Sequence, residues 1–442
     1  MINTDVALLL LAAIAFTGFV LDALFERIRV ASVLPLMLVG VVIVRVGLLP
    51  SDTRGSLDAI IPFVSALTIA VILFSVGLEI RLSDLFRVVG RASVFTLAVQ
   101  TASGVALAGL AYLAFHWEPS ICFVFGFGIS GPSSVAVPVL VRAARISPDL
   151  KTTLLFESVL SDVLQLIVPL TLLALLASGN FAPASIGEEL ALQILGSAAA
   201  GVALGLGWLF VLDRLREVTK GYNWTLTITM VLATYAIADL AGLSAAITIF
   251  IFGLTVGNAL LFDAAKRHLA PSGLGLEPGL LSRSLERVRE TLGLTTANLD
   301  VEQIQQVHRE ITFFAGAFFF VYLGVLFEVS ALTFVLVAAT IGAAVLMLGV
   351  RFLFLPILSG YLSTEPTRRR SERALISFNI SRGLAAAVIA TVPLSMHLVI
   401  PGFLDAMFLA ILFSTVVSTI GIFALYNRTP APDTLDVYGP LG

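Results

Sequence analysis

Two carboxylic acids stand inside an apolar segment of this chain, where packing alone gives them no purpose. The segment 154–164 reads LLFESVLSDVL, with Glu157 and Asp162 among leucine, valine and phenylalanine. An ionised side chain at the centre of a bilayer costs roughly 3 kcal/mol or more, and such residues usually handle protons or ions. Arg382 lies in a second apolar segment. Two acids and one base in these surroundings predict an ion transport protein.

The spacing of these side chains indicates separate roles. On a helix Ser158 and Asp162 share one face, and Glu157 and Ser161 share the neighbouring face. The two acids are about 7.5 Å apart along the axis, so they should not act as one tight pair. We predict that Asp162 binds the transported ion. Because Arg382 cannot lose its proton and needs an acid partner, we predict a structural ion pair between Glu157 and Arg382.

A third element is a segment that cannot remain a regular helix. Residues 125–138 read FGFGISGPSSVAVP and contain three glycines and two prolines, which interrupt helices. Broken backbone at membrane depth survives where it is buried in protein or lines a cavity, and its freed carbonyls can coordinate a cation. The alternative is a kinked helix whose small residues favour close helix contacts.

The composition restricts the chain to one class of protein. Of its 442 residues, 58% are hydrophobic and 12% are charged, against about 25% charged residues in soluble domains. The mean hydropathy is +1.02, and we predict an all-α polytopic membrane protein. The single Cys122 and four scattered histidines argue against a disulfide, a metal cluster or a cofactor. No basic tract suggests a nucleic-acid partner.

Thirteen apolar segments are candidate membrane spans, since a span needs about 20 apolar residues. They cover approximately residues 6–24, 32–49, 57–78, 92–115, 119–141, 152–177, 190–212, 223–242, 244–262, 311–328, 330–361, 374–395 and 398–426. Basic residues gather in the loops after the odd-numbered spans, which the positive-inside rule places in the cytoplasm. The N-terminus is then outside and the C-terminus inside, in a protein of the inner cell membrane. The polar stretch 263–310 is predicted to be a cytoplasmic connector.

Five sequence motifs, in order, resemble the monovalent cation/proton antiporter superfamily, close to its NhaP-like sodium/proton branch. The sequence ESVLSD at 157–162 is similar to the branch motif Glu-Ser-x-x-Asn-Asp, and Ser381-Arg382-Gly383 is similar to its Arg-Gly segment. Three further segments resemble family segments: LFSVGLE at 73–79, LAGLS with GLTVGN within 240–258, and FFFVYLG at 318–324. The resemblance covers nearly all the spans.

The resemblance implies residue roles. Asp162 would bind a monovalent metal cation or a proton, and Ser158 would ligate the cation through its hydroxyl. A main-chain oxygen near Pro132 would complete the site, with Ser133 and Ser161 also among the ion-binding positions. The resemblance also implies that Glu157 pairs with Arg382.

Two positions depart from the family pattern. Pro132 and Ser133 stand where the branch usually has Thr-Asp, and Ser161 replaces the Asn of Asn-Asp. The electrogenic branch has two adjacent aspartates, whereas this chain has one. The resemblance therefore implies electroneutral, one-for-one exchange of Na⁺ for H⁺, with K⁺ or Li⁺ as alternative cations.

The resemblance also implies a domain organisation with inverted repeats and two broken, crossing helices. Residues 92–177 and 329–426 would form a moving core. Residues 1–91 and 178–328 would form a scaffold that contacts lipid and builds a homodimer. Residues 427–442 would be a short cytoplasmic tail.

Burial disfavours the charged form of a carboxylic acid, whereas a nearby cation favours it. Proton and cation are therefore predicted to compete for Asp162 in an alternating-access cycle. A K⁺/H⁺ antiporter and an uncoupled channel or sensor on the same fold remain alternatives. An intramembrane serine protease is a remote one: GISG at 128–131 fits a Gly-x-Ser-Gly pattern, but no histidine lies within a predicted span to serve as base. We predict that the chain is not an enzyme.

Overall fold

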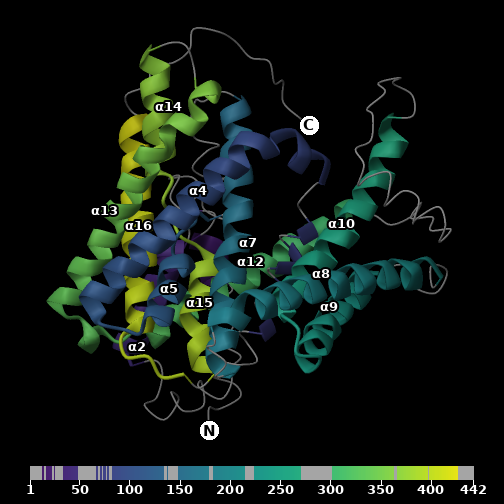
Figure 1. Cartoon of the computed structure of the whole chain (residues 1–442), viewed down its shortest axis with the longest axis horizontal. Coiled ribbons are helices and arrows are strands. Elements are labelled where there is room, and N and C mark those ends of the chain that lie inside the picture. Colours follow the sequence, from purple (N-terminus) through teal and green to yellow (C-terminus); the bar gives the residue numbers. More distant parts are fainter. Residues whose placement is uncertain are drawn as a thin grey trace.

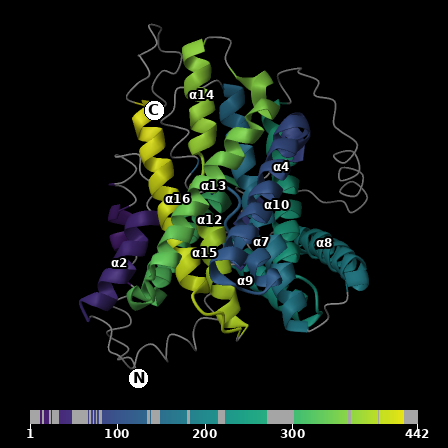
Figure 2. The ribbon, with the colours of Figure 1, turned by 60° about the vertical axis from the view of Figure 1, so that its left-hand side comes forward.

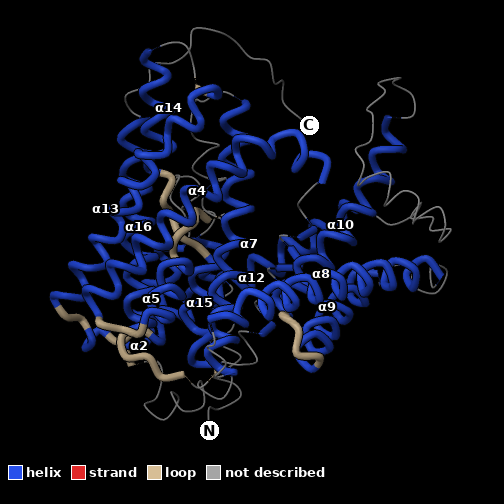
Figure 3. Tube along the Cα trace, viewed as in Figure 1, coloured by secondary structure: helices blue, strands red, loops and turns tan. Residues whose placement is uncertain are grey.

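The computed structural model describes most of the chain and is helical where it has regular structure (Figure 3). The described residues are 12–13, 16–21, 24, 33–47, 66–67, 70–71, 73–75, 77–78, 82–133, 137, 148–178, 183–214, 223–269, 301–362, 366–396 and 398–426. Within these ranges there is no β-strand, as the composition predicted.

The helices follow the predicted spans closely. They are α2 (Val33–Arg45), α4 (Leu82–Phe115), α5 (Pro119–Gly128), α7 (Pro148–Ser178), α8 (Pro183–Arg214), α9 (Asn223–Leu240), α10 (Ala245–Leu269), α12 (Val301–Leu326), α13 (Phe334–Phe354), α14 (Pro366–Phe378), α15 (Leu384–Ser395) and α16 (Phe403–Tyr426), with 3₁₀ helices η1 (Val329–Ala331) and η2 (Leu355–Tyr361) flanking α13. Among the described residues, 5 helices are long and apolar enough to cross a membrane. Predicted spans 1 and 3 lie largely outside the described residues, so the total of thirteen stays a prediction.

The helices pack in two groups. Helices α4, α5, α7, α13, α14, α15 and α16 contact one another, whereas α8, α9 and α10 form a separate cluster. Figure 1 shows this cluster to the right of the first group, and Figure 2 shows it from a second direction. The contact of α7 with α10 joins the first group to the cluster of α8, α9 and α10. Helix α12 packs against α2 and is joined to the first group by its contact with α15.

Two predicted spans are broken. Helix α5 ends at Gly128 and is followed by the unwound residues 129–133, while residues 379–383 separate α14 from α15. These stretches are drawn as loops in Figure 3. The Ser133 amide donates to the Ser381 carbonyl at 3.0 Å, so the two unwound segments meet. The predicted interruption of span 5 is confirmed.

Some helices extend beyond the predicted spans. Helix α14 begins at Pro366, before the expected start of span 12, because its first turns carry many charges and give no hydropathy signal. Helix α10 continues to Leu269 and α12 begins at Val301, so both helices extend into the connector predicted at 263–310, which stays a prediction. The central part of that connector lies outside the described residues.

Candidate functional site

One face of α7 carries the polar residues that the sequence singled out. Ser158, Ser161, Asp162 and Gln165 recur at helical spacing, and each is at most 6% exposed. A Cβ atom built on Gly131 would lie 2.6 Å from the Ser161 Cβ. The Gln165 amide donates to the Gly128 carbonyl. The unwound end of span 5 therefore lies directly against the face that carries Asp162.

Helix α4 contacts both α7 and α5 next to the candidate site. The Gln100 amide donates to the Ser161 carbonyl at 3.2 Å. Gly126 of α5 lies against the main chain of α4 at Gly104, an approach that leaves no room for a side chain. Helices α4, α5 and α7 are thus held together by glycine contacts and side-chain amides around the candidate site.

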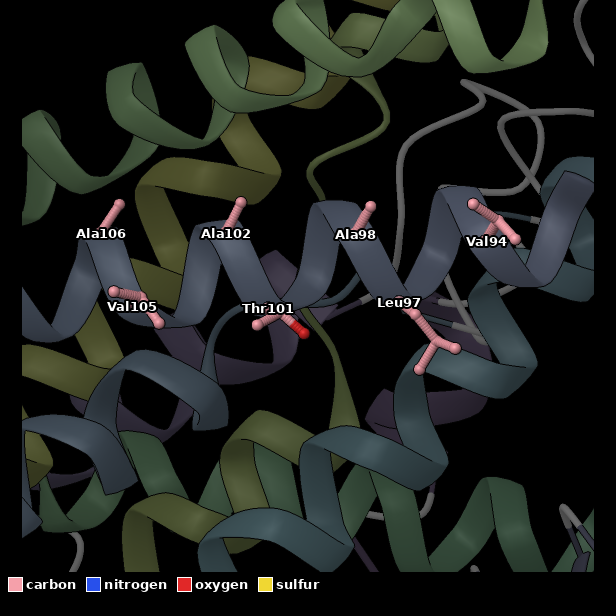
Figure 4. Close-up of a pocket in the computed structure, with 7 residues that line it drawn as sticks. All are labelled: Val94, Leu97, Ala98, Thr101, Ala102, Val105 and Ala106. Atoms are coloured by element: carbon pink, nitrogen blue, oxygen red, sulfur yellow. The ribbon is translucent and has the colours of Figure 1, made fainter.

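The opposite face of α4 has a different character. It forms a shallow apolar hollow that is open to the surroundings, and its lining residues, labelled in Figure 4, all belong to this helix: Val94, Leu97, Ala98, Thr101, Ala102, Val105 and Ala106. Gln100 lies on the buried side of α4, at 3% exposure. The hollow is therefore separate from the polar site.

Arg382 holds the unwound chain of span 5. Its Nε donates to the Ile129 carbonyl, and its Nη2 donates to the Ser130 carbonyl at 3.1 Å and contacts the Met347 sulfur. Arg382 is 1% exposed and lies within electrostatic range of Asp162. The guanidinium therefore replaces helical hydrogen bonds that the break removes.

The predicted ion pair between Glu157 and Arg382 is wrong. Glu157 instead forms a bidentate pair with Arg351 of α13, with nitrogen–oxygen distances of 2.6 and 3.0 Å. The Arg351 Nε donates to the Ile376 carbonyl at 2.7 Å. The side chains of both pair members are at most 2% exposed. The reason is that Arg382 is committed to carbonyl groups, whereas α13 presents a second arginine directly to Glu157.

Sequence reasoning did not identify Arg351 as the partner of Glu157. It stands alone in the long apolar segment 330–361, and its cost at that depth was a signal of a buried acid partner. Sequence spacing gave no means to choose between two arginines for one glutamate.

Most main-chain carbonyls of the unwound segment already accept a hydrogen bond, and only the others are available to a ligand. Each carbonyl of residues 127–130 accepts a hydrogen bond from a side chain: Ser130, Gln165 or Arg382. The Ser133 carbonyl accepts from the amide four residues later at 3.0 Å. Among the residues that the structure describes, no donor reaches the Gly131 and Pro132 carbonyls.

The Ser158 hydroxyl is also oriented for a further contact. It donates to the Leu155 carbonyl at 2.8 Å, which leaves the lone pairs of its oxygen to accept. Across the described residues there is no group of three or more histidine, cysteine or acidic side chains that could hold a metal ion. One carboxylate with neutral oxygens around it fits a singly charged cation.

Comparisons with known proteins identify the family and the fold of this chain. The model of the sodium/hydrogen exchanger transmembrane family matches residues 10–275. The Na⁺/H⁺ antiporter NhaP of Pseudomonas aeruginosa is 29% identical over 198 residues, which are 42% of this chain. The match spans somewhat under half of that relative, 45% of its length.

Solved structures show the same fold. The sodium proton antiporter MjNhaP1 of Methanocaldococcus jannaschii at pH 8 superposes with a TM-score of 0.71 and 17% identity, covering 95% of this chain and 100% of that one. An electron-microscopy structure of MjNhaP1 gives a TM-score of 0.67 over 99% of this chain and 100% of that one, also at 17% identity. The chain is therefore an all-helical, multi-pass membrane protein that belongs to the sodium/hydrogen exchanger family, in the NhaP-like branch of the monovalent cation/proton antiporters, whose members are transporters and not enzymes.

Proposed function

We propose that this chain exchanges a monovalent cation, Na⁺ in the first place, for H⁺ by alternating access, with both ions competing for Asp162. The observation that carries the proposal is the position of this buried carboxylate, on the α7 face that lies against the unwound residues 129–133. A buried acid beside freed carbonyls can take a proton, or a cation stripped of part of its water.

The proposed cation ligands are the Asp162 carboxylate, the Ser158 hydroxyl and the Pro132 carbonyl. The hydrogen bonds of this segment support Pro132, because the carbonyls of residues 128–130 have side-chain donors, whereas no described donor reaches the carbonyls of Gly131 and Pro132. Ser133 and Ser161 position the chain through the main-chain bond to Ser381 and the contact with Gly131. Ligation by their hydroxyls stays a prediction.

The charges of the site favour one-for-one exchange. Arg351 neutralises Glu157 in a buried bidentate pair, so we assign the charge of the exchanged ion to Asp162. A bound proton and a bound Na⁺ add the same charge to the core. Exchanging one for the other then moves no net charge across the membrane.

The packing supports a division into a moving core and a scaffold. The core would contain the helices around the two breaks, within residues 92–177 and 329–426, and the scaffold, within residues 1–91 and 178–328, would contain α2, α8, α9, α10 and α12. We further propose a homodimer built on the scaffold, inverted repeats related through the two breaks, an N-terminus outside the cell and a C-terminus in the cytoplasm.

Purified protein in liposomes with a pH-sensitive dye inside tests the function. An imposed Na⁺ gradient should move protons, at a rate independent of the membrane potential, and K⁺ and Li⁺ gradients rank the alternative cations. Cation flux without proton movement would identify an uncoupled channel instead. Asp162→Asn should abolish exchange in a folded protein; transport like that of the wild type would refute the assignment.

Competition at one carboxylate also predicts a pH dependence. Lower pH favours the protonated acid, so the apparent KM for the cation should rise about tenfold per pH unit on the acid side of the carboxyl's titration. Measuring KM at several pH values checks this slope. A KM that is independent of pH, with exchange intact, would indicate separate proton and cation sites.

A further inference from the structure

The break between α14 and α15 has a second side, which faces α16. The Ser381 hydroxyl donates to the Thr415 hydroxyl at 3.3 Å, and the Thr415 hydroxyl donates to the Arg382 carbonyl at 3.3 Å. One and a half turns further along α16, Gly421 lies against the Phe378 ring. Asn379 lies between Phe378 and Ser381 in sequence, and Ser418 lies between Thr415 and Gly421. From these two contacts we therefore infer that Asn379 is near the level of Ser418.

Several polar atoms at this level have no partner. The carbonyl oxygen and the amide nitrogen of Asn379, the Ser418 hydroxyl and the Thr419 hydroxyl are buried without a hydrogen bond to any described residue. Asn379 is 2% exposed and Ser418 is 0% exposed. We call Asn379, Thr415, Ser418 and Thr419 the polar seam. Buried polar groups left unmet are strongly unfavourable, so a ligand is expected there.

The unmet atoms specify the chemistry of that ligand. The Asn379 nitrogen is a donor only, its oxygen is an acceptor only, and the hydroxyls can do both. A metal cation would satisfy the oxygens and leave the amide N–H groups unmet. Water donates and accepts, and a buried water typically makes about three hydrogen bonds to such groups.

We propose that the polar seam is a buried water site, and that water bound there makes Asn379 a positioning residue for the crossing of the two breaks. Asn379 lies two residues before Ser381, whose carbonyl accepts from the Ser133 amide. Ser133 in turn follows Pro132. Water bound to Asn379 would thus hold the main chain at Ser381 in place. Through the hydrogen bond from Ser133 to Ser381, it would also fix the position of the Pro132 carbonyl.

An experimental structure of the wild-type protein, at a resolution that shows water, tests the site directly. Ordered density within hydrogen-bond distance of the Asn379 amide and the Ser418 hydroxyl supports it. A direct bond between these two side chains, or a metal ion on the Asn379 oxygen, overturns it. This measurement does not depend on transport.

The positioning role rests on the proposed exchange and is tested with liposomes. Asn379→Leu, which keeps the size and removes the polar atoms, and Ser418→Ala should each raise the apparent KM for Na⁺ several-fold. Ser414→Ala is the matched control, because that hydroxyl lies on the same face of α16 and is satisfied by its own helix at 3.1 Å. Its KM should not change.

The outcomes separate the two proposals. If the wild type shows no exchange, the proposed function fails, while the density still decides the water site. If the wild type exchanges and Asn379→Leu and Ser418→Ala match Ser414→Ala in KM, the positioning role is wrong. Asn379→Gln, which retains the amide, should restore most of the lost cation affinity; a KM as high as that of Asn379→Leu would also count against it.

Discussion

Two of the close contacts that glycine permits between distant segments behave differently. Gly40 of α2 and Gly324 of α12 lie against each other's main chain, within two helices that both remain intact. Gly383 lies equally close to Ser133, but there both segments are unwound. Glycine permits the approach in each case, because any side chain would collide.

The difference lies in the backbone polar groups. An intact helix satisfies its own N–H and C=O groups, so the crossing of α2 and α12 has nothing to offer an ion. At the broken crossing the freed groups need partners, and Arg382 and Gln165 supply several. The carbonyls that remain are the ones available for chemistry. Close packing of intact helices therefore gives mechanical support only, whereas close packing of unwound segments also leaves carbonyl groups that can bind an ion.

The largest expected effect comes from the buried ion pair that supports the broken crossing. Arg351→Met should destabilise the protein by about 3–5 kcal/mol, because it leaves Glu157 charged and buried without a partner. Thermal unfolding in detergent measures the change. Adding Glu157→Gln to Arg351→Met should recover much of the loss, and equal instability of the double variant would mean that the arginine acts mainly through packing.

Gly383→Ala should damage the broken crossing and spare the scaffold. Its Cβ would overlap the Ser133 side chain, so the two segments must separate, which displaces the Pro132 carbonyl. Exchange should fall about 10²-fold, as misplaced catalytic geometry does in enzymes, in a protein that still purifies as a folded species. Ser133→Gly in the same chain relieves the collision and should restore activity; if it does not, the contact is not the cause.

Gly324→Ala should do the reverse at the helical crossing. The added methyl group meets the Met37 carbonyl, and we expect a loss of roughly 1–3 kcal/mol in stability with the apparent KM for Na⁺ unchanged. Gly349→Ala is the control, since nothing lies within 4 Å of its built Cβ. A large rise in KM for Gly324→Ala would show that the two crossings are coupled.

A loss of stability as small as that of Gly324→Ala is expected at Gln165. Gln165→Leu removes the donor to the Gly128 carbonyl and should cost about 1–3 kcal/mol, the penalty for an unsatisfied buried acceptor. Denaturant or thermal unfolding checks the stability. Gln165→Glu retains the size without the donor and serves as a comparison; unchanged stability in both variants would mean that water replaces the amide.

Much of this protein follows from local sequence. The membrane class follows from hydropathy, because about 20 apolar residues must match the thickness of the bilayer. The break after Gly128 follows from glycine and proline, which weaken helices wherever they occur. The shared face of Ser158 and Asp162 follows from helical periodicity. Each of these inferences depends only on neighbours along the chain.

The tertiary structure decided which charged groups meet. Glu157 and Arg351 are 194 residues apart in sequence, and no spacing rule distinguishes Arg351 from Arg382 as the partner. The choice depends on which helix lies beside α7 and on which arginine the broken chain already occupies. The break at 379–383 shows the same limit, because the pairing of Ser381 with Ser133 exists only where the two segments cross. Local sequence sets conformation through short-range sterics and solvation, whereas partners are chosen by the packing of the whole bundle.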